Sequence, residues 1–170
     1  MDKIKKTKVP PKPAEKAAAK KRNDGSAKAK RTAARLAAVQ VLYQMRLNNQ
    51  NAKSAVREYI SHRSGFKMDG DVYIPPDAEL LDDIVMGVQK RWTDVDEIVT
   101  AALAAGKKGE VETLLESILR CGAYELLANT KVDTGIIIAD YISVTAGFYD
   151  LKEPKLVNAI LDKIAKTVRE

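Results

Sequence analysis

The sequence predicts an all-α protein, built as a compact bundle of about seven helices. Apolar residues recur at helical spacing from about residue 30 to the C-terminus. Only the run Ile136–Ile138 has the β-branched composition of a strand, and no second strong strand exists to pair with it. The chain has 170 residues, which is enough for one domain with a substantial core.

The first part of the chain is basic and poor in apolar residues. Residues 1–30 contain eleven cations and three carboxylates, a net charge of +8, whereas the whole chain carries +6 and the remainder therefore −2. Three prolines within residues 10–13 prevent a helix near the start. We expect residues 1–27 to form a disordered basic tail, which increases solubility or attracts nucleic acid, and residues 28–170 to form the folded domain.

Two helices and a break follow the tail. Residues 31–47 and 51–63 each place apolar side chains on one arc of a helical wheel. In the first of them this arc is formed by Ala34, Ala37, Ala38, Val41, Leu42 and Met45. Two glycines and a pair of prolines then interrupt the helical pattern over residues 65–77.

The next two helices are predicted to meet near residue 93. The apolar face of the third helix is formed by Leu80, Leu81, Ile84, Val85, Val88 and Trp92. Thr93 and Asp96 resemble a capping box, so a fourth helix is expected to open at Thr93. It should end by Gly106, before a turn at residues 107–109.

Three further helices complete the predicted bundle. Residues 110–129 carry apolar side chains at helical spacing, and so do residues 133–147. The second of these ranges contains the β-branched run, but the spacing continues through Ala139, Ile142 and Ala146, which indicates a buried helix rather than a strand. The last helix begins near Pro154, because proline suits the first turn of a helix.

The residues offer little for catalysis or metal binding. His62 is the only histidine, and Cys121, the only cysteine, is expected to be a small core residue. A metal site needs several ligands at short spacing, and residues 106–110 lack the pattern of a phosphate-binding loop. We therefore expect a binding protein without cofactor or metal rather than an enzyme.

The same composition predicts the compartment. A single cysteine excludes an intrachain disulfide and fits a reducing environment. No apolar run approaches the ~20 residues of a membrane span, and the charged N-terminus lacks the apolar stretch of a signal peptide. The expected location is the cytoplasm.

Cations cluster on the first helix. At ~100° per residue, Tyr43 lies beside a sector roughly 60° wide that contains four cations: Lys28, Arg31, Arg35 and Arg46. Cations at a helix N-terminus oppose the helix dipole, so they do not serve helix stability. The sector predicts a surface that follows a phosphate backbone while an aromatic ring stacks on an unpaired base. The alternative is a solvated helix end that continues the lysines of the tail.

Three segments resemble the family of bacterial transcription antitermination factors called NusB. They are AARLAAVQVLYQM at 33–45, ILRCGAYELL at 118–127 and KLVNAILDKIAK at 155–166, in the family's order and at compatible spacing. The resemblance covers roughly residues 30–168. The fold that it implies, two packed helical subdomains, agrees with the bundle inferred from apolar spacing.

The resemblance implies a non-enzymatic RNA-binding protein. Family members bind the single-stranded boxA element of ribosomal RNA leader transcripts, usually with the small-subunit ribosomal protein NusE, and join a complex on RNA polymerase that suppresses termination. Some self-associate through the RNA-facing surface, which makes a homodimer an alternative state. They contact RNA through an arginine-rich N-terminal segment and the first helix. The corresponding residues here are Lys30, Arg31, Arg35, Gln40 and Tyr43. With Lys28 added from the cation sector, the predicted RNA-binding residues are Lys28, Lys30, Arg31, Arg35, Gln40 and Tyr43.

The chain departs from the family pattern at several positions. Thr32 and Ala33 dilute the arginine run, and lysine does not reproduce arginine's planar fork. Later departures are Ala139, Asp140, Thr145 and Ala159. All of them bear on RNA affinity or mark a divergent paralogue, and none of them bears on the fold.

Some polar residues of the motifs are expected to be structural. Tyr124, Glu125 and Asn158 belong here, Asn158 as a buried group that bonds a neighbouring helix end or loop. Arg120 and Asp162 are expected to pair as scaffold residues.

Two alternative functions remain at the level of the sequence. One is a related RNA-binding module of the kind fused to rRNA cytosine methyltransferases, which the lack of a cofactor-binding domain in residues 1–170 disfavours. The other is a protein-interaction adaptor of the same fold, with weak or non-specific RNA binding.

Overall fold

The structure, a computed structural model, describes residues 25–63, 74–106 and 109–169, and all regular elements within these ranges are α-helices. In chain order they are α2 (Ala27–Asn48), α3 (Ala52–Arg63), α4 (Ala78–Lys90), α5 (Trp92–Ala105), α6 (Thr113–Ala128), α7 (Thr134–Ala146) and α8 (Lys152–Val168). The predicted all-α fold with about seven helices is confirmed. The β-branched run lies in α7, so the choice of helix over strand is confirmed as well.

Four helices begin at a side-chain oxygen that caps the first turn. Ser26 caps α2, Asn51 caps α3, Asp77 caps α4 and Asp133 caps α7, each accepting a hydrogen bond from a backbone N–H of that turn. The first N–H groups of a helix have no intrahelical acceptor, so these oxygens fix where each helix starts.

The start of α5 differs from the predicted one. The helix begins at Trp92, and Arg91 is the shared cap residue between α4 and α5. No side-chain oxygen caps this start, so the predicted capping box of Thr93 and Asp96 is wrong. Asp96 instead accepts a hydrogen bond from Arg120 at 2.7 Å, and Trp92 belongs to α5 rather than to the face of α4.

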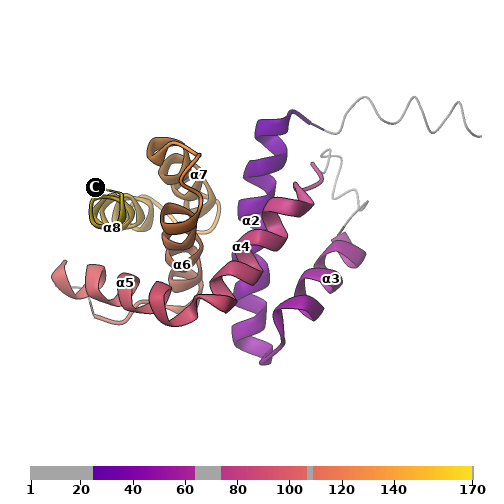
Figure 1. Cartoon of the computed structure of the whole chain (residues 1–170), viewed down its shortest axis with the longest axis horizontal. Helices are drawn as coiled ribbons and strands as arrows, with labels where there is room; N and C mark the ends of the chain where they lie inside the picture. The colour runs from indigo at the N-terminus through magenta and orange to yellow at the C-terminus, as the bar shows by residue number, and fades with distance from the viewer. Residues whose placement is uncertain (1–24, 64–73, 107–108, 170) are drawn as a thin grey trace, which may run out of the picture.

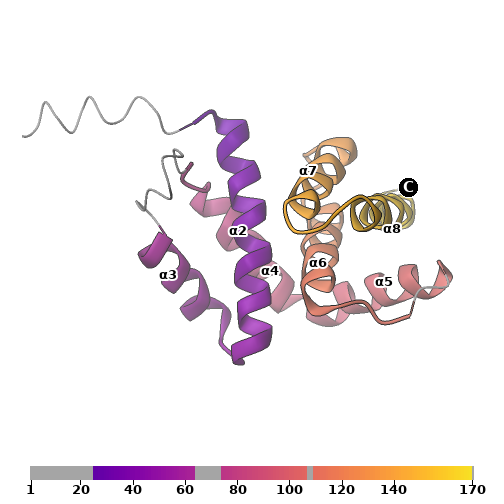
Figure 2. The same ribbon diagram turned by 180° about the vertical axis from the view of Figure 1, so that it is seen from behind.

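Helix α2 is central to the arrangement (Figures 1 and 2). It packs against α3 and α4, which also contact each other, and these three helices form an N-terminal group. Helices α5, α7 and α8 gather around α6 and form a C-terminal group. The groups meet where α2 contacts α6 and α7 and where α4 contacts α6, which agrees with the expected two packed subdomains.

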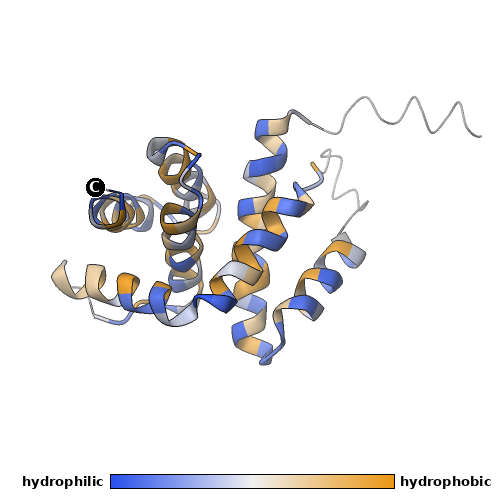
Figure 3. Ribbon diagram, in the orientation of Figure 1, coloured by the Kyte–Doolittle hydropathy of each residue, from blue (hydrophilic) through white to orange (hydrophobic). Residues whose placement is uncertain are grey.

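A core of buried apolar side chains runs through both groups. Figure 3 shows apolar and polar residues interspersed along each helix, as expected for amphipathic helices that bury one face. Helices α4 and α6 approach closely at Gly87, where a Cβ atom would lie 2.0 Å from Cζ of Tyr124. The hydroxyl of Tyr124 donates to Asp83 at 3.1 Å, and burial together with Asp83 raises the pKa of Tyr124 to about 12. Tyr124 is thus structural, as predicted.

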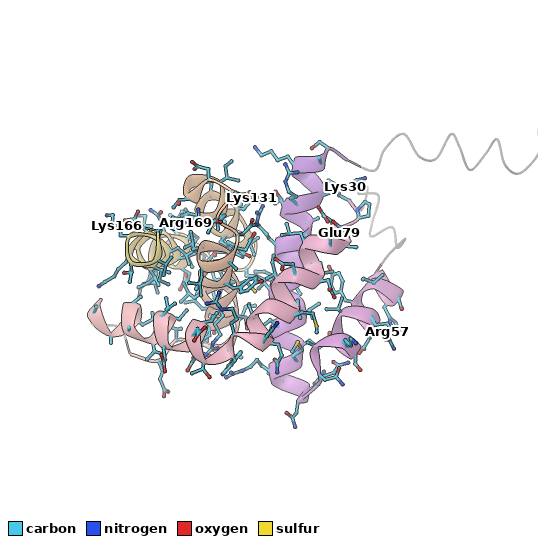
Figure 4. All side chains as sticks on the ribbon, in the orientation of Figure 1. Lys30, Arg57, Glu79, Lys131, Lys166 and Arg169 are labelled. Carbon is cyan, nitrogen blue, oxygen red and sulfur yellow. The ribbon has the colours of Figure 1, made fainter. Side chains whose placement is uncertain are left out.

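The connection between α6 and α7 is held by Arg169, which is labelled in Figure 4. Its guanidinium donates hydrogen bonds of 2.7–3.3 Å to four backbone carbonyls and of 3.1 Å to the hydroxyl of Thr134. The four carbonyls belong to Glu125, Leu126, Asn129 and Val132. The last carbonyls of a helix have no intrahelical donor, so one side chain satisfies several of them. Arg169, which follows α8, thereby ties this helix to the connection between α6 and α7.

Two predictions about polar residues are corrected. Asn158 is exposed on α8 rather than buried. Arg120 and Asp162 form ion pairs with other partners: Arg120 with Asp96 and Glu116, and Asp162 with Lys166.

Parts of the predicted tail, break and turn lie outside the described residues, namely 1–24, 64–73 and 107–108. Within the described part, Ser26 caps α2 and Ala27 begins it, so the folded domain starts before residue 28. His62 is exposed near the end of α3, and Cys121 is buried in the core, as expected, where burial raises the pKa of its thiol. No described helix has the length and apolar character needed to cross a membrane.

Candidate nucleic-acid interface

The outward end of α2 is cationic. Lys28 and Arg31 are exposed in the first turns, and the 22-residue helix contains no Asp or Glu at all. The N–H groups of a first turn already create a positive potential, to which these cations add. Ser26 fixes this end by capping, and the N–H of Asp77 donates to the carbonyl of Lys30 at 3.0 Å.

Arg35 lies in the interior, so the prediction that it shares the solvent-facing sector is wrong. The residue is 1% exposed. Its Nε and Nη2 donate to the two carboxylate oxygens of Glu125 on α6, at 2.7 and 3.0 Å. Its Nη1 donates to Asp140 on α7 at 2.7 Å. All three guanidinium nitrogens are engaged inside the protein, so Arg35 is removed from the set of direct RNA contacts.

The Arg35–Glu125 pair belongs to a larger buried network. Tyr141 donates its hydroxyl proton to Glu125 at 2.7 Å, and Asn129 donates to the same carboxylate at 3.3 Å. Burial lowers the pKa of Arg35, but the hydrogen bonds and charge of Glu125 outweigh burial and raise that pKa overall. Burial, reinforced by the charge of Glu125, raises the pKa of Tyr141 well above its usual value. The structural role expected of Glu125 is therefore confirmed.

The network reaches the surface at Asp140, a departure from the family pattern. Asp140 Oδ2 accepts from Arg35 and also from the hydroxyl of Thr32 at 3.1 Å. Thr32, another departure, also donates to the carbonyl of Lys28 at 3.2 Å. These bonds hold the N-terminal half of α2 against α7, which fixes the direction in which Lys28 and Arg31 project.

Gln40 and Tyr43 lie on the outer side of α2 and are half-buried. Gln40 Oε1 accepts a hydrogen bond from Tyr59 of α3 at 3.2 Å, which leaves its NH₂ group as the donor side of the amide. An oriented amide and an aromatic ring are groups that recognise unpaired bases.

The turn of ~100° per residue directs Lys30 away from Lys28 and Arg31. Lys30 is half-buried near the N-terminal end of α2, on the side of α4 and near Glu79, as Figure 4 shows. The structure therefore separates Lys30 from Lys28 and Arg31, although the three are close in sequence.

Arg46, the last member of the predicted sector, lies at the opposite end of α2. Its guanidinium stands 5.2 Å from the ring centroid of Trp92, and Arg120 covers the same ring at 4.5 Å. Glu116 lies 3.7 Å from Arg46. The sector is thus not continuous: its two ends are exposed and its centre is a buried ion pair.

Two exposed apolar residues of α2 were not predicted to be part of any site. Leu36 is 37% exposed and Leu47 is 62% exposed. A signal for them exists in the sequence, because both fall outside the apolar arc of this helix and beside Gln40 and Tyr43 on the wheel.

Comparison with known proteins identifies the family. The family model described as "NusB family" matches residues 32–166. The chain belongs to the NusB family. The NusB match begins after Lys28, Lys30 and Arg31, so these three cations precede it, whereas Gln40 and Tyr43 lie inside it.

Relatives agree with this assignment. The chain is 41% identical over 140 residues to the transcription antitermination protein NusB of Rhizobium rhizogenes, covering 82% of this chain and 88% of that protein. The NusB protein of Agrobacterium fabrum is also 41% identical over 140 residues, with 82% and 85% covered.

Solved NusB structures share the fold. T. maritima NusB superposes with a TM-score of 0.65 at 20% identity, over 80% of this chain and 90% of that one. A crystal structure of the antitermination factors NusB and NusE in complex with dsRNA gives 0.66 at 23% identity, over 81% and 96%.

Proposed function

We propose that this protein is a transcription antitermination factor that binds boxA-type RNA of ribosomal RNA leader transcripts together with NusE. The observation that carries the proposal is the accessible surface of α2. Lys28 and Arg31 are exposed at the N-terminal end of this helix, and Gln40 and Tyr43 follow on its outer side. Cations bind phosphates, and an amide and an aromatic ring distinguish bases.

The proposed RNA contacts are Lys28, Arg31, Gln40 and Tyr43, with Lys30 contributing from the α4 side. Phosphate contacts by Lys28 and Arg31 supply affinity, which falls as salt rises because bound counterions are released. Base contacts by Gln40 and Tyr43 supply sequence preference.

The wider role follows from the family. Its relatives are transcription antitermination proteins, and one structural neighbour was solved with NusE and dsRNA. In the proposed role the chain assembles with NusE in the cytoplasm and joins the antitermination complex on RNA polymerase. Binding and assembly account for this role, so it requires no catalysis.

The test is fluorescence anisotropy with a labelled boxA-type RNA and a scrambled RNA of equal length. The full chain and a variant that lacks residues 1–24 but keeps the Ser26 cap are titrated at near-physiological salt, with and without NusE. Tighter binding of the boxA-type RNA by both proteins, strengthened by NusE, is expected. Equal binding of both RNAs, lost with residues 1–24, would show that the tail binds any polyanion and that the helical body is a protein adaptor.

A further inference from the structure

Helix α2 carries a line of exposed and half-buried side chains on one face. We call Leu36, Gln40, Tyr43 and Leu47 the outer strip of α2. Their spacing of four, three and four residues places them on one face of the helix. The two leucines are the exposed large apolar side chains of α2, at 37% and 62%. Large apolar side chains that line up on a helix face facing water indicate a contact surface.

The outer strip has well-defined borders. Figure 2 shows α2 in front of α4, with α3 on one side and α6 and α7 on the other. On the α3 side the border is the hydrogen bond from Tyr59 to Gln40. On the α7 side the border is the hydrogen bond from Thr32 to Asp140. The strip is therefore a track along α2, between α3 and α7.

The charge of α2 itself is positive. Lys28 and Arg31 are exposed at the N-terminal end of the helix, and α2 carries no carboxylate. An apolar track on a helix with exposed cations at one end complements a polymer whose backbone is anionic and whose bases have apolar faces.

We propose that the outer strip binds the bases of single-stranded RNA, with Leu36 and Leu47 packing on base faces to either side of Tyr43. This inference rests on the proposed function and extends its base-contacting surface to two residues that the NusB resemblance does not assign. Eleven residues separate Leu36 from Leu47, a length of roughly 16 Å, which accommodates about three to five nucleotides.

A second copy of the chain is the competing occupant, and the charges disfavour it. Parallel packing of two outer strips would bring Lys28 and Arg31 of both copies together. Antiparallel packing would place them against Leu47 and Asn48, which supply no carboxylate. Neither arrangement pairs the cations, whereas RNA pairs them with phosphates.

The first experiment replaces the two leucines. Leu36→Ala and Leu47→Ala, singly and together, are titrated with a labelled single-stranded boxA-type RNA across a salt series. Each substitution should weaken binding by about threefold to tenfold, because apolar contact is lost. The slope of log K against log salt should stay unchanged, because no phosphate contact is removed. The matched control is Leu151→Ala, a leucine 81% exposed between α7 and α8, which should leave affinity unchanged.

The second experiment removes bases instead of side chains. A set of RNAs of the same length is made, each lacking the bases of three consecutive nucleotides at a different position. The wild-type protein should bind more weakly to the RNAs whose abasic segment covers one particular position. The Leu36→Ala/Leu47→Ala protein should lose less affinity for those same RNAs, because its contact to the missing bases is already absent. Equal losses of affinity for the two proteins at every position of the abasic segment would overturn the proposal.

Two further readouts separate the possible failures. Unchanged RNA affinity in the leucine variants would overturn this inference alone, provided that Lys28→Ala/Arg31→Ala still weakens binding. If neither the leucine variants nor Lys28→Ala/Arg31→Ala weakened RNA binding, the proposed function would be overturned as well. Sedimentation velocity without RNA tests whether a second copy of the chain binds the outer strip. If the wild type is a dimer, Leu36→Ala/Leu47→Ala is a monomer and RNA affinity is unchanged, the outer strip serves self-association and the proposal is overturned.

Discussion

Two arginines of α2, four residues apart, have opposite surroundings. Arg31 is exposed near the start of the helix, whereas Arg35 is 1% exposed and held by Glu125 and Asp140. Both are part of one cationic sector on a helical wheel, yet only Arg31 can reach a polyanion. The difference shows that a cluster of cations on one helix can divide between binding and architecture according to what packs against it.

The inner arginine also determines where the outer one points. Arg35 ties α2 to α6 and α7, and Thr32 adds a bond from the outer side of α2 to Asp140. The inward face thus fixes the helix on the C-terminal group, the exposed N-terminal end presents Lys28 and Arg31, and the outward face presents the outer strip. If this comparison holds, substitutions on the two faces must affect different properties.

The largest expected effect is on stability, from Arg35→Ala. Removing the guanidinium leaves the Glu125 carboxylate buried without its cation, which costs about 3–5 kcal/mol in the free energy of unfolding. Chemical denaturation followed by circular dichroism measures this loss. Arg31→Ala should stay within about 0.5 kcal/mol of the wild type, because its side chain is exposed. Equal stability of the two variants would contradict the comparison.

Tyr141→Phe should give the next largest effect and a change with pH. Near neutral pH it removes a buried hydrogen bond to Glu125 and should cost about 1–3 kcal/mol. Because the pKa of Tyr141 is raised in the folded state, its contribution is complete below the unfolded pKa of about 10 and is lost as pH rises above it.

The measurement for Tyr141→Phe is urea unfolding at several pH values from 7 to 11. Wild-type stability should fall more steeply above about pH 10 than that of Tyr141→Phe, by roughly 1.4 kcal/mol per pH unit. Parallel curves for the two proteins would show that Tyr141 is not held neutral by the buried network.

A smaller effect than those of Arg35→Ala and Tyr141→Phe is expected from Arg46→Ala, at the C-terminal end of α2. Its guanidinium is partly exposed, faces Trp92 and lies 3.7 Å from Glu116. An exposed contact of this kind should change the free energy of unfolding by less than about 1 kcal/mol. The fluorescence of Trp92, the only tryptophan, provides the probe. A loss as large as that of Arg35→Ala would mean that the C-terminal end of α2 is as important for stability as the buried ion pair at Arg35.

The sequence predicted the helices well because each buries one apolar face, and amphipathic spacing reports that directly. It placed Arg35 wrongly because a helical wheel gives the direction of a side chain and not what lies beyond it. The partner, Glu125, is 90 residues further along the chain. The start of α5 was misplaced for a related reason: Asp96 has the spacing of a capping residue, but Arg120 of α6 engages it.

The outer strip is a case in which the sequence did not predict exposure. Leu36 and Leu47 were visible in the sequence as apolar residues outside the buried arc, but their exposure depends on whether another helix covers them. Helices α3 and α7 lie to either side of this face. That arrangement is a tertiary feature, which local spacing does not contain.

The most direct test of the central claim compares salt dependence of RNA binding. The slope of log K against log salt is measured with boxA-type RNA for three proteins: the wild type, Lys28→Ala/Arg31→Ala and Lys155→Ala/Lys163→Ala. The last pair removes the same charge from the exposed face of α8. We predict a slope shallower by about 1.4 for Lys28→Ala/Arg31→Ala, since each phosphate contact on single-stranded RNA contributes about 0.7. The α8 variant should keep the wild-type slope. Equal slopes for all three proteins would contradict the assignment of RNA binding to the outward end of α2.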